Sequence, residues 1–222
     1  MGKLVDIITP LHKRGTSSRD YLGRMSDSKV ECMEVGRQYG RDFWDGDRKY
    51  GYGGYKYDGR YAVVAENLIR MYNLPDNARI LDVGCGKGFL LYEFTKRLPR
   101  CEVSGFDISS YAVENAKDEI KEQLFVHKAQ DPFPFKDREF DFVFSITTLH
   151  NLYINQLKTA LSEMDRVGKN KYMVVESYRN EAELFNLQCW ALTCEAFFTP
   201  DEWTWLFNEF GYAGDYEFIY FE

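Results

Sequence analysis

A run of alternating glycines between two apolar segments carries the clearest chemical signal in this sequence. The apolar run 80–83 contains an acidic residue, Asp82, and an amphipathic run begins at Phe89. This order predicts a buried strand, a tight turn and a helix N-terminus, because glycine adopts backbone angles that a Cβ forbids and lets backbone N–H groups approach a ligand. The turn itself consists of Gly84, Cys85, Gly86, Lys87 and Gly88.

A second acidic residue predicts a ligand site at the same place. Asp107 follows the segment 101–106, which we expect to form the next strand. A carboxylate at the carboxyl end of that strand can accept hydrogen bonds from both hydroxyls of a ribose. The glycine turn and the two carboxylates therefore predict a ligand that contains a nucleoside, which could be a dinucleotide or a sulfonium cofactor.

Three motifs together resemble a known family. Residues 80–88 (ILDVGCGKG), 105–109 (GFDIS) and 131–141 (DPFPFKDREFD) are similar to the class I methyltransferases that use S-adenosylmethionine, in the small-molecule branch that includes ubiquinone-pathway enzymes. The resemblance covers about residues 62–178 and is weaker onward to the C-terminus. It implies S-adenosylmethionine as the cofactor and an α/β fold, a doubly wound, mostly parallel seven-stranded sheet with helices on both faces and an antiparallel last strand.

The resemblance also implies which residues bind the cofactor. Asp82 would hold the turn or, through water, the ammonium group, whereas Asp107 would bind the ribose and Ile108 would cover one face of the adenine. Gln130 and Asp131 compete for the adenine amino group, because the stretch before the Pro-Phe motif is about one residue shorter than usual, and we favour Asp131. Further cofactor contacts are expected at Gly84, Cys85, Gly86, Gly88 and, at the end of the fourth strand, Ser145.

The segments around these motifs alternate between strand and helix patterns. This alternation is typical of a doubly wound sheet, whose ligands lie at the carboxyl ends of the strands. Capping-box sequences at 28–31 and 199–202 predict two helix starts. We expect strands near 80–83, 101–106, 124–128, 140–146, 171–176 and 216–221, and helices near 29–39, 62–72, 89–98, 109–119, 155–167, from 181, and 200–210.

The segment 43–61 differs from its surroundings, because tyrosines alternate with glycines and no regular period survives. We interpret it as an ordered loop that covers the site, since a tyrosine offers a rigid apolar face and a hydroxyl. The alternative is a loop packed by its own rings without ligand contact. The expected division is an N-terminal helical segment with this lid over 1–61 and a cofactor-binding core over 62–222. Candidate substrate contacts in the lid are Tyr52, Tyr55, Lys56 and Arg60, of which the last three could instead meet the methionine carboxylate of the cofactor.

Methyl transfer from a sulfonium is an in-line displacement, which requires the acceptor to be held about 3 Å from the methyl carbon. A base is needed only where the acceptor must lose a proton. His150 follows the fourth strand, and an imidazole with an ordinary pKa of about 6.5 suits that task. A structural role for His150 is the alternative, and Glu176 is a weaker candidate base. We expect a small polar acceptor, such as a sugar or sugar nucleotide, methylated on oxygen or nitrogen, because aromatic faces with hydroxyls suit polyhydroxylated ligands.

Composition narrows the classes of partner. The net charge of −7 disfavours a nucleic-acid partner, since such proteins use a basic surface. No apolar run approaches 18 residues and no signal-peptide core is present, so we expect no membrane partner and a cytoplasmic location. The five cysteines have no metal-like spacing, so we expect reduced thiols and no metal. The basic cluster at residues 12–14 is interpreted as solvated.

Two rival enzyme classes fit the motifs less well. A nicotinamide dehydrogenase prefers G-x-G-x-x-G, and this chain has Phe89 at the last of those positions. In the family, nucleic-acid methyltransferases carry an Asp/Asn-Pro-Pro-aromatic run after the fourth strand, where this chain has Ile-Thr-Thr-Leu at 146–149. Two alternatives remain open: aminopropyl transfer by a relative of the same fold, and a non-catalytic protein that binds the cofactor.

Overall fold

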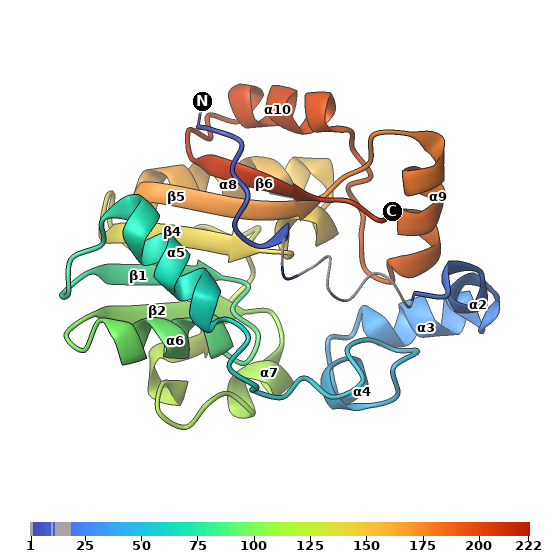
Figure 1. Ribbon diagram of the computed structural model, residues 1–222, viewed down its shortest axis with the longest axis horizontal. Coiled ribbons are helices and arrows are strands. Elements are labelled where there is room, and N and C mark those ends of the chain that lie inside the picture. Colours follow the sequence, from blue (N-terminus) through green and yellow to red (C-terminus); the bar gives the residue numbers. More distant parts are fainter. Residues whose placement is uncertain (1, 10, 12–18) are drawn as a thin grey trace.

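The computed structural model describes residues 2–9, 11 and 19–222, so the basic cluster at 12–14 lies outside the described residues. The described chain forms a parallel six-stranded sheet in the order β3-β2-β1-β4-β5-β6 (Figure 1). Because the strand order reverses between β1 and β4, their carboxyl ends form the switch point at which such sheets bind ligands. The strands are β1 (Arg79–Val83), β2 (Glu102–Asp107), β3 (Leu124–Val126), β4 (Phe140–Ile146), β5 (Gly168–Glu176) and β6 (Asp215–Ile219).

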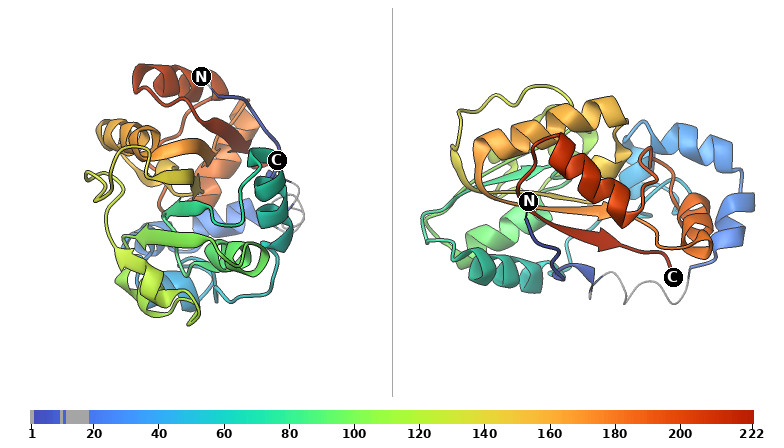
Figure 2. Two further views of the ribbon diagram at one scale, coloured as in Figure 1. Left: turned by 90° about the vertical axis from the view of Figure 1, so that its left-hand side faces the viewer. Right: turned by 90° about the horizontal axis from the view of Figure 1, so that it is seen from above.

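Helices cover both faces of the sheet, as the doubly wound pattern predicts. Figure 2 (left) shows α5 and α8 on opposite sides of the strands, and Figure 1 shows α2, α3 and α4 beyond their carboxyl ends. Within the described residues no helix is long and apolar enough to cross a bilayer. The helices are α2 (Tyr21–Ser26), α3 (Lys29–Gly36), α4 (Arg41–Asp45), α5 (Ala62–Tyr72), α6 (Phe89–Arg97), α7 (Ser110–Glu114), α8 (Ile154–Val167), α9 (Glu181–Trp190) and α10 (Pro200–Glu209), with 3₁₀ turns η1 (Lys121–Gln123) and η2 (Leu149–Asn151).

The strands build two apolar layers because successive side chains point to opposite faces of a sheet. In β4, Phe142 and Phe144 pack into the layer formed with α5 and α6, whereas Val143 packs into the layer formed with α8 and α10. In β5, Tyr172 and Met173 divide between the two layers in the same way. A parallel sheet buried on both faces explains why β4 reads as a continuous apolar run.

The last strand corrects the expected topology. β6 runs parallel to β5, not antiparallel, with Tyr172 opposite Asp215 and Glu176 opposite Ile219. The reason is the connection: α9 and α10 return the chain to the amino end of β5, whereas an antiparallel partner would follow from a hairpin. The sheet also has six strands among the described residues, not seven. On the outer edge of β6, Leu4 forms a single parallel bridge with Tyr216.

Both predicted helix starts are confirmed, but only one of the two capping boxes forms. Thr199 and Glu202 form the predicted capping box, with Pro200 in the first turn of α10. Ser28, in contrast, has a φ of 48° and its side chain makes no capping hydrogen bond, so α3 begins without one. Ser109 caps α7, although the helix expected near 109–119 already ends at Glu114.

Candidate active site

The glycine turn lies against β2 through its own backbone. The amides of Gly84 and Cys85 donate to the carbonyl oxygen of Phe106, at 2.8 and 3.0 Å. A Cβ on Gly84 would lie 2.3 Å from the Thr148 side chain, and one on Gly86 would lie 2.9 Å from Trp44; both glycines have positive φ. Glycine is therefore required at these two positions both for the turn and for its close neighbours.

Asp107 and Asp82 are buried carboxylates with different partners. Asp107 accepts from the amide of Gly86 through one oxygen, at 2.8 Å, and from the amide of Ser109 through the other, at 2.9 Å. Burial raises the pKa of Asp107. Asp82 is only 5% exposed, and its side chain accepts no hydrogen bond from any described residue. Burial and the nearby Asp107 charge raise its pKa well above the ordinary value.

A cavity of about 210 Å³ lies where these groups meet, at the switch point between β1 and β4. Its wall combines the glycine turn and strand ends with aromatic side chains from the lid. Nine of the residues expected to bind cofactor or substrate line it: Tyr52, Tyr55, Asp82, Gly84, Cys85, Gly86, Asp107, Ile108 and Gln130.

The other expected cofactor residues lie elsewhere. Ser145 is fully buried and donates to the carbonyl oxygen of Val83, at 2.8 Å, which ties β4 to β1. Gly88 faces the core, since a Cβ there would meet Ile120. Asp131 is exposed outside the cavity, so its competitor Gln130 is the one of the two that lines it.

Several lining residues were missed from the sequence. His127 follows β3 at the same sheet edge, and its buried Nε2 has no hydrogen-bond partner. A polar residue just after a third strand was the available signal, but the strand was expected to extend through it. Thr147, with a φ of 53°, follows β4, and Asn151 is the last residue of η2; no local pattern marks either residue as part of a site.

Rings of the lid lie directly on the glycine turn. Trp44 stacks on Tyr52, with ring centroids 5.2 Å apart and planes 10° apart, and Tyr55 stacks on Phe89 at 4.9 Å. The Trp44 indole donates to Ser109 Oγ, at 2.9 Å. The lid therefore packs by its own rings and also lines the cavity.

An ion pair between buried Lys87 and half-buried Asp45 attaches the lid to the glycine turn. Lys87 Nζ lies 2.8 and 2.6 Å from the two carboxylate oxygens of Asp45 and 3.0 Å from the carbonyl oxygen of Tyr55. The Tyr111 hydroxyl donates to the same carboxylate, at 2.8 Å. Although burial opposes the charge on Asp45, the hydrogen bonds from Lys87 and Tyr111 outweigh it and lower the pKa of that carboxyl.

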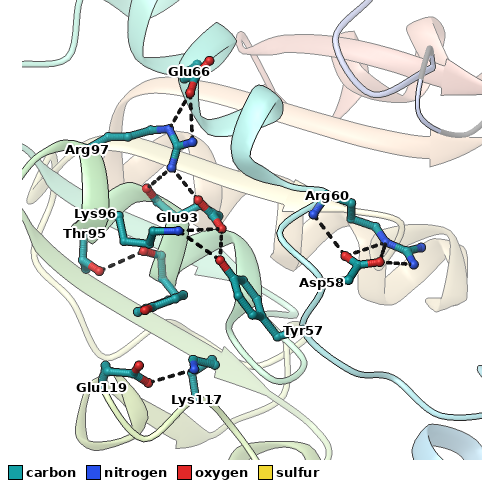
Figure 3. Close-up of polar contacts among 11 residues, drawn as sticks. Tyr57, Asp58, Arg60, Glu66, Glu93, Thr95, Lys96, Arg97, Lys117 and Glu119 are labelled. Atoms are coloured by element: carbon teal, nitrogen blue, oxygen red, sulfur yellow. Dashed lines mark hydrogen bonds and ion pairs between the residues drawn. The ribbon is translucent and has the colours of Figure 1, made fainter.

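The far end of the lid is held by a second polar cluster (Figure 3). The Tyr57 hydroxyl donates to Glu93, a fully buried carboxylate on α6. Arg97 pairs with Glu93 and also with Glu66 of α5, at 2.9 Å. Nearby, Arg60 pairs with Asp58 within the lid itself. The lid is thus attached at both ends to the core.

Replacing Lys87 with methionine should release the first of these attachments. The half-buried Asp45 would keep its charge without its partner, so we expect the free energy of unfolding to fall by about 1.5 kcal/mol and proteolysis within 43–61 to accelerate. Urea denaturation and limited proteolysis measure both effects. In the double variant with Asp45→Asn, part of this loss in the free energy of unfolding should be recovered. If the loss in the double variant equals the sum of the losses in the two single variants, Lys87 and Asp45 do not interact.

A second cavity, of about 310 Å³, adjoins the first. Six residues line both: Phe43, Tyr52, Tyr61, Ile146, Thr147 and Asn151. His150, Glu176 and Arg60 line only the second cavity, while Lys56 is exposed and lines neither. His150, the predicted catalytic residue, therefore lines the second cavity and not the first, which contains Asp82 and the glycine turn.

His150 is buried and directed at Glu176 through both ring nitrogens. Its Nδ1 accepts from the amide of Glu176, at 3.3 Å, and its Nε2 lies 3.5 Å from a carboxylate oxygen of the same residue. Burial lowers the pKa of His150, although the Glu176 charge opposes this. A neutral imidazole with Nδ1 as acceptor carries its proton on Nε2, facing the carboxylate.

Comparison with known proteins identifies the family. A family model described as "Methyltransferase domain" matches residues 74–211, more than half of the chain, including the glycine turn, both carboxylates and His150. The chain belongs to the class I methyltransferases that use S-adenosylmethionine. The resemblance carried by the three sequence motifs is thereby confirmed at the level of the family.

The names of curated relatives of this methyltransferase indicate different activities. The arginine-hydroxylase NDUFAF5 of Homo sapiens, mitochondrial, is 27% identical over 54% of this chain and 34% of that protein. A malonyl-[acyl-carrier protein] O-methyltransferase of Legionella pneumophila is 30% identical over 40% of this chain and 32% of that protein. The chain spans less than two thirds of the length of the curated relatives it matches first.

Solved structures show the same fold. The YcgJ protein of Bacillus subtilis superposes with a TM-score of 0.53 at 21% identity, covering 66% of each chain. A chain from a solved complex that contains the Trm112 methyltransferase activator of Haloferax volcanii gives a TM-score of 0.56 at 18% identity, covering 88% of this chain and 77% of that one.

The first cavity of the methyltransferase fits its cofactor chemically. Asp82 offers a buried carboxylate that accepts no hydrogen bond from the part of the chain that the structure describes, which suits a ligand that carries an ammonium and a sulfonium group. Gly84 and Gly86 leave the backbone open to close approach. The unpartnered Nε2 of His127 offers a further polar contact on the β3 side.

Proposed function

We propose that this methyltransferase transfers the methyl group of S-adenosylmethionine to an oxygen or nitrogen of a small polar metabolite. The observation that carries the proposal is the buried carboxylate of Asp82, which has no hydrogen-bond partner among the described residues and lies beside a glycine turn at the switch point of the sheet. Bound there, S-adenosylmethionine supplies an electrophilic methyl carbon, which passes to the acceptor atom while the carbon–sulfur electron pair stays with sulfur.

The residues of the first cavity bind and orient the cofactor in this proposal. Asp82 stabilises its positive charge, and Asp107 accepts from the ribose hydroxyls with the lone pairs left by its two backbone hydrogen bonds. Ile108, which is 44% exposed, covers the adenine. Gln130 takes the adenine amino group instead of Asp131, because Gln130 lines the cavity.

The acceptor lies in the second cavity, where Tyr52 and Arg60 contribute lid contacts. The proton released by an acceptor hydroxyl goes to the Glu176 carboxylate, since both nitrogens of His150 already face Glu176. His150 then acts as a positioning residue that fixes the carboxylate by hydrogen bonds. The two adjoining cavities exclude bulk water from the transfer and hold the reactants in line.

Glu176→Gln should slow methyl transfer without weakening the binding of the cofactor. Because positioning supplies much of the rate, we expect kcat to fall about 30-fold, less than the 10²–10⁴ typical of general bases. Steady-state kinetics and calorimetry with S-adenosylhomocysteine separate the two effects. Glu209→Gln, which removes an exposed carboxylate on α10, is the matched control. Equal kcat values for the two variants would exclude Glu176 as the proton acceptor.

Binding and product analysis test the function as a whole. The native chain should bind S-adenosylmethionine by calorimetry, and Asp107→Ala should weaken binding at least about tenfold, a loss of one charge-assisted hydrogen bond or more. With polar acceptors, the expected product is S-adenosylhomocysteine. Methylthioadenosine would instead indicate aminopropyl transfer, and binding without any product across a broad panel would indicate a non-catalytic protein.

The same proposal includes a division of the chain and a location. Residues 1–61 form the lid segment and 62–222 the cofactor-binding core, because residues 43–61 cover a site built by the later strands. We place the enzyme in the cytoplasm, which fits its five unpaired cysteines. Limited proteolysis that removes the lid segment while the core stays folded would support this division.

A further inference from the structure

Three arginines converge on one tryptophan in the second cavity. The guanidinium carbons of Arg19, Arg24 and Arg48 lie 4.9, 5.0 and 5.1 Å from the ring centroid of Trp190, and all four residues line the cavity. They come from the α2 region, the lid and the end of α9; α2 and α9 lie side by side (Figure 1). These three positive charges gather in one cavity of a chain whose net charge is −7.

Two of these arginines are bonded to neutral groups. Arg24 donates to the carbonyl oxygens of Trp190, at 3.3 Å, and Arg48, at 2.7 Å, and Arg48 itself donates to the carbonyl oxygen of Gly51. Among the ion pairs of the described residues, neither Arg24 nor Arg48 takes part. Burial and the charge of Arg48 lower the pKa of Arg24, although the charge of Asp27 acts in the opposite direction.

The rest of the wall does not supply that anion. Glu176 is the one carboxylate among the described residues that line the cavity, and it is turned toward His150. Arg60, the fourth lining arginine, is paired with Asp58 of the lid. The lining of the cavity is therefore electropositive when empty, and a ligand that carries an oxyanion would neutralise it.

We propose that the methyl acceptor is an anion whose carboxylate or phosphate binds Arg24 and Arg48, with Arg19, over Trp190. This deepens the proposed function and rests on it. Guanidinium groups stacked on an aromatic face keep their N–H edges available for bidentate contact with an oxyanion. The apolar side of the same cavity, formed by Ile8, Leu11, Ile219 and Phe221, packs against the body of the ligand.

Asn151 sets the direction of the bound acceptor. Its Oδ1 is buried and has no hydrogen-bond partner among residues 2–9, 11 and 19–222, while its Nδ2 donates to the carbonyl oxygen of Thr148, at 3.0 Å. Asn151 lines both cavities, and the arginines line only the second. A hydroxyl or amine of the acceptor donates to Asn151 at the junction, beside the cofactor, while the oxyanion lies at the arginine end. A phosphorylated or acidic sugar, including a sugar nucleotide, meets both requirements.

Calorimetry with two simple probes tests the anion site and distinguishes its sources. The protein saturated with S-adenosylhomocysteine is titrated with inorganic phosphate and, separately, with malonate. Both should bind, and the tighter probe indicates whether the natural acceptor carries a phosphate or a carboxylate. Arg48→Gln and Arg24→Gln should each weaken the tighter probe at least tenfold. Arg100→Gln, which removes an exposed arginine paired with Asp76, changes the net charge equally and should leave the binding of the probe unchanged.

The outcomes separate this proposal from the one on which it rests. Failure to bind S-adenosylhomocysteine would count against the proposed function. Normal binding of S-adenosylhomocysteine, together with no binding of either probe or with equal weakening in Arg48→Gln and Arg100→Gln, would overturn the anion site alone. Retained binding of S-adenosylhomocysteine in each variant shows that the fold is intact, so a lost anion is then a local effect.

Discussion

Replacing Gly84 with alanine is expected to eliminate cofactor binding and to destabilise the fold. Gly84 has a φ of +82°, and its Cβ would lie 2.3 Å from both Oγ1 and Cγ2 of Thr148. The left-handed conformation costs about 1–2 kcal/mol for a residue with a Cβ, and overpacking costs about 1–3 kcal/mol more. We therefore expect the free energy of unfolding to fall by about 3 kcal/mol and the affinity for S-adenosylmethionine to fall at least about 100-fold, since the turn must shift.

A second glycine separates the two causes. Gly211 also has a positive φ, +73°, but nothing lies within 4 Å of the position of its Cβ. Gly211→Ala should lose only the backbone contribution and bind the cofactor normally. Urea denaturation and calorimetry on both variants provide the comparison. Equal losses of stability in the two would show that Thr148 yields freely, and the close contact would then not explain the requirement for glycine.

The parts of this site that could be predicted from sequence lie close together in the chain. A strand, a glycine turn and a helix are consecutive, so Asp82, Gly84 and Gly86 form a local pattern whose geometry follows from backbone sterics. Asp107 follows the next strand, and parallel strands place their carboxyl ends at one edge. The direction of β6 was predicted wrongly because it depends on how α9 and α10 pack, which residues 216–221 do not encode.

The parts that were missed depend on tertiary contacts. The sequence indicated Lys87 only as a residue of the glycine turn, yet Lys87 forms an ion pair with Asp45. Asp45 lies before the core, in a segment without regular periodicity. Arg19, Arg24 and Arg48 lie far from Trp190 in the sequence, and each arginine alone resembles an ordinary surface residue. Gln130 and Asp131 are neighbours, so only the direction of the backbone decides which one faces the cavity.

Asp82→Asn should stabilise the ligand-free protein and should weaken the binding of the cofactor. Asp82 is buried, accepts no hydrogen bond within the described part of the chain, and has a raised pKa because of burial and the charge of Asp107. Each unit by which the folded pKa exceeds the unfolded value costs about 1.4 kcal/mol once both states are ionised. We therefore expect the variant to be more stable than the native chain at pH 7.5 by about 1–3 kcal/mol, the cost of a buried polar group left without a hydrogen bond. Losing a hydrogen bond to a charged group should weaken S-adenosylmethionine about 10- to 100-fold.

The stability difference between Asp82→Asn and the native chain should depend on pH. A carboxyl with a raised folded pKa keeps its proton longer in the folded state, so its contribution to stability is full below the unfolded value of about 3.9 and is lost as the pH rises through the folded pKa. The stability difference between Asp82→Asn and the native chain should therefore be smallest near pH 4 and grow toward neutral pH. Urea denaturation across that range measures it, with the exposed Asp118→Asn as the matched control.

A native chain more stable than Asp82→Asn at pH 7.5 would show that the carboxylate is already satisfied without a ligand. The argument for a cation in the first cavity would then lose its main support, because the protein would gain nothing from neutralising Asp82. The opposite result, a stabilised variant that no longer binds the cofactor, would show that the fold retains a destabilising charge at the one place where a positively charged ligand compensates it.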